Sequence, residues 1–224
     1  ACMLILALFN VSAFIWLRLS ERGEQPWYRE SMNMLALPYV FQTTWRCIFI
    51  SEYPNRRTIS DSHLNSVLVA RLLAAIGEFC FGVQLVLGLQ VLTTGHQIPG
   101  PALLSIVVLD GLGQCCATYG TIAGSYFPFL LEGIAWTIMF GIVLALTLTS
   151  TVASREVTLL ISAATAAAML YMGVSYCPMC WRQWQEEEHA MAKKEISKPL
   201  RSKAWEALTL RMPTEDWSVW KHEV

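Results

Sequence analysis

The stretch from residue 62 to residue 181 is apolar almost throughout, and this pattern restricts the fold more than any other feature of the chain. Only six of its side chains are charged, whereas all other charged side chains lie in 18–61 or 182–223. The chain of 224 residues is 54% hydrophobic and 15% charged, and an ordinary soluble domain carries about 25% charged residues. This distribution predicts a membrane-embedded core flanked by wetter segments.

Five segments are long enough to cross a bilayer as helices, because a hydrocarbon core of about 30 Å requires about 20 residues. Backbone polar groups in lipid must be satisfied within their own segment, so these segments are helices and not strands. Short connections between them favour antiparallel packing of sequence neighbours. The predicted fold is therefore all-α, a polytopic transmembrane helical bundle with spans at about 2–17, 64–92, 101–122, 126–150 and 157–178.

The segment 32–50 is ambiguous, because a proline, two threonines and Arg46 interrupt it. With five spans, the arginines of 18–63 and the basic residues that follow 179 lie on one side of the membrane, as the positive-inside bias favours. A sixth span would divide these basic clusters between the two sides. We therefore expect an interfacial helix at 32–50, and a sixth span is the alternative.

The chain changes character at residue 178, which divides a predicted transmembrane domain (1–178) from an extramembrane amphipathic tail (179–224). Within the tail, 181–196 is predicted to continue the last span as a polar helix, and 202–212 to form a second short helix ended by a proline. The first span lacks the basic start and the small-residue cleavage site of a signal peptide, so we interpret it as a membrane helix.

Charged and polar side chains inside the predicted spans form the candidate functional site. A charge near the bilayer centre costs about 2.5–3.5 kcal/mol on insertion scales, so such a side chain turns towards protein or water. Arg71 and Glu78 are seven residues apart and project from one face of their helix, and the next two spans carry Asp110, Gln114 and Glu132. We expect Arg71 to pair with an acidic group. The set predicts a buried polar cluster that acts as an ion pair, as a pocket or as a proton path.

Other residues are assigned to packing and to the membrane edge. Ala70, Ala74 and Gly82 share the helical stripe of Glu78, which predicts that this stripe packs against another helix. Aromatic and basic side chains at span ends are typical of headgroup anchors. Four residues are predicted to have this role: Arg56, Arg57, Trp181 and Trp184.

The sequence shows no evident site for haem, retinal or zinc, and it does not identify a cofactor. No span carries a pair of histidines for bis-histidine haem or a lysine for a retinal Schiff base. Neither HExxH nor a second CxxC beside that of 177–180 appears, so no zinc site is evident. Amide and carboxylate side chains remain as potential axial ligands of a magnesium-centred pigment. A net charge of −1 gives no reason to invoke nucleic acid.

Three classes of function fit these observations. The leading hypothesis is a non-catalytic integral subunit of a larger membrane assembly, for example an energy-transducing photosynthetic or respiratory complex. The alternatives are a small proton- or ion-coupled transporter or channel, and a membrane-embedded enzyme that acts on a lipid or isoprenoid with Glu78 or Asp110 as acid or base. The expected partners are membrane lipids and other membrane protein subunits, and the expected localisation is integral to a membrane with several passes.

Overall fold

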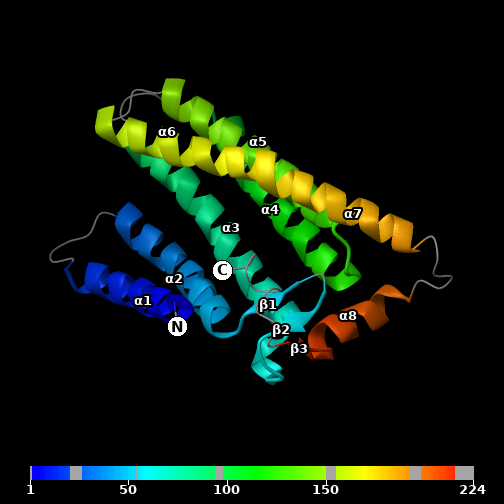
Figure 1. The fold of residues 1–224 in the computed structure, drawn as a ribbon. Coiled ribbons are helices and arrows are strands. Elements are labelled where there is room, and N and C mark those ends of the chain that lie inside the picture. The colour runs from blue at the N-terminus through cyan, green and yellow to red at the C-terminus, as the bar shows by residue number, and fades with distance from the viewer. Residues whose placement is uncertain are drawn as a thin grey trace. The chain divides into compact units, whose positions relative to one another are not determined.

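The computed structural model describes residues 2–20, 27–53, 55–93, 98–149, 155–191 and 198–214. Within these ranges the chain is helical apart from three two-residue strands and the connecting segments (Figure 1). The predicted all-α polytopic bundle is thereby confirmed. The chain forms two compact units, each of which is described by itself. Unit 1 comprises 1–77, 118–124 and 196–224, and unit 2 comprises 78–117 and 125–195.

Four helices of the described chain are long and apolar enough to cross a membrane. Three are α3 (Val67–Leu92), α4 (Gly100–Ala123) and α5 (Phe127–Thr149). The fourth runs from Arg155 to His189. It is continuous through α6 (Arg155–Leu170), a π-helical segment η2 (Tyr171–Tyr176) and α7 (Cys177–Met191).

These helices cover four of the five predicted spans, and α7 continues the last one into the tail as expected. The first predicted span lies on α1 (Cys2–Ser20), whose apolar part, Ala7–Trp16, is shorter than a bilayer crossing requires. The count of five spans stays a prediction. So does the division of the chain at residue 178.

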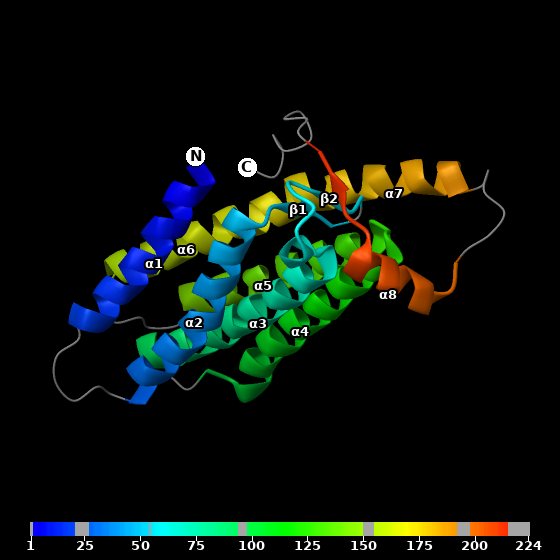
Figure 2. The ribbon, with the colours of Figure 1, turned by 90° about the horizontal axis from the view of Figure 1, so that it is seen from below.

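In unit 1, α1 and α2 (Trp27–Ile48) lie side by side and antiparallel (Figures 1 and 2). Helix α2 is not among the four candidate spans, and it passes through Pro38 as one helix. After α2 the connector forms β1 (Ser51–Glu52) and β2 (Arg57–Thr58), which pair antiparallel. Ser62 then caps the 3₁₀ turn η1 (His63–Asn65) by accepting a hydrogen bond from the backbone N–H of Leu64.

The tail of the chain completes this small sheet, a feature that the sequence analysis missed. Helix α8 (Leu200–Thr209) starts directly after Pro199 and is followed by β3 (Met212–Pro213). Strand β3 pairs parallel to β2, in register Arg57 with Met212 (Figure 2). The tail of unit 1 is therefore joined by backbone hydrogen bonds to the connector between α2 and α3.

A buried arginine connects the sheet to α8. Arg56 has a φ of 54°, a left-handed conformation in the turn between β1 and β2. Its guanidinium contacts Glu206 of α8 at 2.7 Å and donates to the backbone carbonyls of Lys203 and Ile122. Lys198 contacts the other carboxylate oxygen of Glu206 at 2.6 Å. Hydrogen bonds from Lys198 and then from Arg56 lower the pKa of Glu206.

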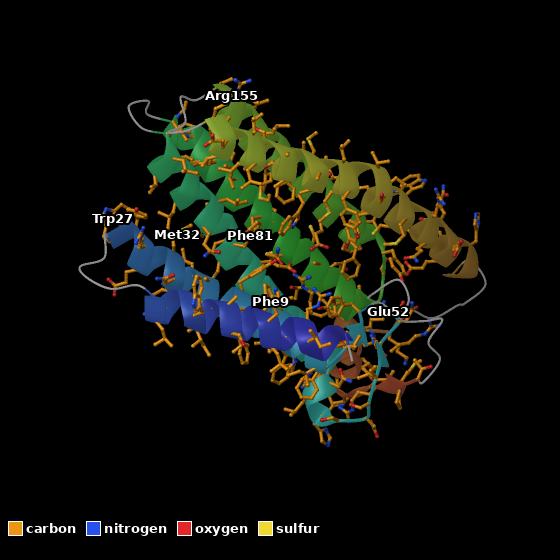
Figure 3. The ribbon with its side chains drawn as sticks, turned by 60° about the vertical axis from the view of Figure 1, so that its left-hand side comes forward. Phe9, Trp27, Met32, Glu52, Phe81 and Arg155 are labelled. Carbon is orange, nitrogen blue, oxygen red and sulfur yellow. The ribbon has the colours of Figure 1, made fainter. Side chains whose placement is uncertain are left out.

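In unit 2, α5 packs along α6, η2 and α7. The core between α3, α4 and α5 consists of large apolar side chains: Leu89, Leu103, Ile106, Trp136, Met139, Phe140 and Val143. Phe81 of α3 packs against this core, and Arg155 marks the start of α6 (Figure 3). The candidate site lies beside this apolar core.

Candidate functional site

Four of the five residues predicted to form the polar cluster belong to unit 2. They are Glu78, Asp110, Gln114 and Glu132, whereas Arg71 belongs to unit 1. Asp110, Gln114 and Glu132 are buried in the described structure. No lysine or arginine occurs between residues 72 and 154. The parts of α3, α4 and α5 that belong to unit 2 thus carry carboxyl groups and no lysine or arginine.

Arg71 is placed by an aromatic side chain within unit 1. The guanidinium carbon of Arg71 lies 5.8 Å from the centroid of the Tyr53 ring, and that of Arg46 lies 5.4 Å from the same centroid. Both distances are within the range of cation–π attraction, which strengthens as water is removed. Arg71 is only 3% exposed. Tyr53, which the sequence analysis did not single out, is therefore part of the surroundings of Arg71, and pairing of Arg71 with a carboxyl stays a prediction.

Asp110 fills the space where α3 and α4 approach each other. Its side chain is 0% exposed, and its Oδ1 accepts a hydrogen bond from the Gln114 amide at 3.3 Å. The carboxyl group rests on Gly82 of α3: a Cβ added there would collide with Oδ2 and would lie 2.8 Å from the carboxyl carbon. Only glycine leaves room for this contact. The predicted stripe of Glu78 and Gly82 thus does face a neighbouring helix.

Glu132 lies on the first turns of α5 and is 7% exposed. The hydroxyl group of Tyr176 donates a hydrogen bond to Glu132 Oε2 at 3.0 Å. Beside it, a Cβ on Gly133 would lie 2.7 Å from Cys177 Sγ and 2.8 Å from the Tyr176 ring. A glycine of α5 therefore permits close approach of the helix that carries the donor. Tyr176 is a second residue of the candidate site that the sequence analysis missed.

The position of Tyr176 depends on the π-helical segment η2, of which it is the last residue. A π-helical turn inserts extra residues into an α-helix and is frequently found at functional sites. The segment YMGVSY has no charge, proline or paired glycines that would signal such a turn. For this reason, spacing rules for an ordinary α-helix could not have related Tyr176 to Glu132.

Trp136 lies one turn after Glu132 and brings an indole N–H to the cluster. Its ring is stacked on Phe81, with centroids 6.4 Å apart and planes 8° from parallel. A Cβ added to Gly113 would lie 3.0 Å from Trp136 Nε1 and 3.7 Å from Glu132 Cγ, so both side chains cover this glycine of α4. The indole is 8% exposed, and its N–H has no hydrogen-bond acceptor among the described residues.

Chemically, the cluster combines buried carboxyl groups with uncharged hydrogen-bond donors. Buried carboxyl oxygens require hydrogen-bond donors from the protein, because burial removes water from them. An amide, a phenol and an indole can each donate to them or to a small oxygen-containing ligand. In the described part of the chain, no three histidine, cysteine, aspartate or glutamate side chains gather as a metal site. Such an arrangement can hold neighbouring helices together by hydrogen bonds, or it can exchange protons.

The four residues predicted as headgroup anchors differ from one another in their surroundings. Arg56 is buried and bound to Glu206, whereas Arg57 is half-exposed with its guanidinium 3.6 Å from Glu52. In unit 2, the rings of Trp181 and Trp184 lie 5.0 Å apart. Headgroup contact of these residues stays a prediction.

A further carboxylate that the sequence analysis missed stabilises the start of α5. Glu187 of α7 accepts hydrogen bonds from the backbone N–H of Tyr126 at 3.0 Å and from the hydroxyl of Ser125 at 3.2 Å. Ser125 in turn accepts from the N–H of Phe127. The first backbone N–H groups of a helix have no partner within the helix, and the Glu187 carboxylate supplies an acceptor at this end of α5. Glu187 thus ties α7 to α5.

Comparison of the chain with protein-family models, with characterised proteins and with solved structures gives no match. The conclusion on function therefore rests on the residues of this chain and on their geometry alone.

Proposed function

We propose that this chain is an integral, multi-pass membrane protein that works as a non-catalytic subunit of a larger membrane assembly. The membrane placement is supported by the four long apolar helices. In the most apolar stretch of the helix from Arg155 to His189, only 11% of the residues are buried within the chain. Most of this helix is therefore available to lipid or to another membrane protein.

One observation supports a structural role for the polar cluster in particular. Its side chains pack directly on glycines of neighbouring helices, Asp110 on Gly82 and Trp136 on Gly113. Small residues allow helices to approach closely in membranes, and hydrogen bonds between helices add to the attraction. Packing of this kind favours a connection between helices that shapes the subunit.

The first test is extraction in a mild detergent followed by native mass determination. A subunit is expected to elute with other membrane proteins at a fixed stoichiometry. A lone monomer or a homodimer would contradict the proposal. Because membrane extracts also contain contaminants, the stoichiometry must be unchanged across two detergents.

The second test uses the matched pair Glu132→Gln and Glu132→Leu. Glutamine keeps the shape of the side chain and an oxygen that accepts from Tyr176, whereas leucine removes the acceptor. A structural role predicts that the glutamine variant assembles normally and that the leucine variant assembles poorly. Normal assembly of both variants would count against a structural role.

A proton- or ion-coupled carrier is the second candidate, and the indole N–H of Trp136 favours it. A buried donor ordinarily has an acceptor, from the protein or from water, and this donor lies beside Glu132. A carrier predicts proton flux into vesicles that contain the purified protein and a pH-sensitive dye. If Glu132→Gln loses that proton flux but still assembles, the result would contradict a purely structural role of the polar cluster and support the carrier.

A further inference from the structure

An open groove in unit 1 lies between the start of α3 and helix α8. Its volume is about 640 Å³, and its walls are mainly apolar. Leu68 lines one side, and Pro199, Arg201, Trp205 and Leu208 line the other. The volume is within the range of about 300–1,000 Å³ that is typical of small-molecule sites.

Helix α8 has two different faces. On the inner face, Ala207 is 0% exposed, and Glu206 holds Arg56 and Lys198. On the other face, Trp205 is 65% exposed and Leu208 is 38% exposed. A helix with one polar, bound face and one exposed face rich in tryptophan and leucine is typical of a helix that lies in a membrane interface.

The position of the groove along α3 indicates what reaches it. Helix α3 begins at Val67 and is one of the four candidate spans, so Leu68 lies in its first turn. The first turn of a spanning helix lies near the boundary between hydrocarbon and headgroups. The groove is therefore adjacent to lipid headgroups and to the upper part of the acyl chains, if α3 spans as we propose.

Arg201 supplies charge at this level. It is an exposed arginine on the wall of the groove. A guanidinium binds phosphate through two parallel hydrogen bonds and is weakly hydrated, so arginine is well suited to phosphate recognition. Apolar walls next to one cation match the chemistry of a phospholipid, in which one glycerol backbone carries both a phosphate and the acyl chains.

We propose that this groove binds one anionic membrane phospholipid. The phosphate contacts Arg201, and one acyl chain lies along Leu68, Trp205 and Leu208. The bound lipid then holds α8 at the membrane surface beside the start of α3. This inference rests on the proposed membrane placement of α3 and not on the existence of a partner protein.

The test is native mass spectrometry of the full chain after exchange into detergent with phosphatidylglycerol or phosphatidylcholine. The wild-type protein is expected to retain one phosphatidylglycerol and to prefer it over phosphatidylcholine. Replacement Arg201→Gln is expected to reduce this retention about tenfold, the effect of one charge-assisted interaction. Replacement Arg182→Gln, at an exposed arginine of α7, is the matched control and is expected to leave retention unchanged.

A second readout uses the tryptophan in the groove. Brominated phosphatidylglycerol is expected to quench the fluorescence of the wild-type protein more than that of Trp205→Phe, because Trp205 contacts the lipid. Equal retention of both lipids, equal loss in Arg182→Gln, or no difference in quenching would each overturn the proposal. Complete competition by inorganic phosphate would also overturn it, since a simple anion site does not require the acyl chain.

Discussion

Gly82 offers a direct test of how Asp110 is packed. Replacement Gly82→Ala places a methyl group 2.8 Å from the Asp110 carboxyl carbon and 3.1 Å from its Cβ. Carbon atoms in favourable contact are about 3.5–4.0 Å apart, so α3, α4 or the Asp110 side chain must move. Inserting a methyl into a packed site of this kind typically costs about 1–3 kcal/mol.

Gly88 is the matched control for this substitution. It lies on the same helix, and a Cβ added there meets nothing within 4 Å. Both glycine-to-alanine changes gain similar helix propensity, about 0.5–1 kcal/mol. We therefore expect Gly88→Ala to be neutral or stabilising, and Gly82→Ala to have a free energy of unfolding lower than that of Gly88→Ala by about 1–3 kcal/mol.

The assay is reversible unfolding in mixed micelles, with sodium dodecyl sulfate as denaturant and circular dichroism as the signal. The double variant Gly82→Ala/Asp110→Ala removes the carboxyl that the new methyl meets. The loss of unfolding free energy in this double variant should be smaller than the sum of the losses in Gly82→Ala and Asp110→Ala. The difference, which is the coupling energy of the two sites, should be at least about 0.5 kcal/mol. Equal unfolding free energies for Gly82→Ala and Gly88→Ala would refute the contact between Asp110 and Gly82.

Three further outcomes follow from the same geometry. Hydrogen bonds lower the pKa of Glu206 in the folded protein. Its contribution to stability is therefore present above pH 4.5, the ordinary value, and is lost as the pH falls through the folded pKa. Hydrogen exchange of α8 should accelerate in acid, and Glu206→Gln should remove that pH dependence. Tyr176→Phe should lower the free energy of unfolding by about 1–3 kcal/mol through loss of the hydrogen bond to Glu132, whereas Tyr171→Phe, an exposed tyrosine, should not. Glu187→Ala should cost about 1 kcal/mol and increase hydrogen exchange in the first turn of α5 alone.

The sequence predicts the helices of this chain well because one physical constraint determines them. A long apolar segment in a membrane has few alternatives to a helix, and α3, α4, α5 and α6 are all found where composition places them. The short strands are a different case. Each has two residues, and β3 pairs with a connector more than 150 residues away in the sequence, so no local period marks it.

The candidate site shows the same division between what composition reveals and what packing decides. A carboxyl in an apolar helix is conspicuous, and Asp110 and Glu132 could be selected on that ground alone. Their partners could not, because a tyrosine is common in membrane helices, and the packing stripe that includes Gly82 does not indicate which side chain rests on it. Tyr176 reaches Glu132 only through the π-helical segment, and Gly82 matters only because Asp110 rests on it. Sequence identifies the groups that are costly to bury, and only the packing of helices shows which ordinary residues offset that cost.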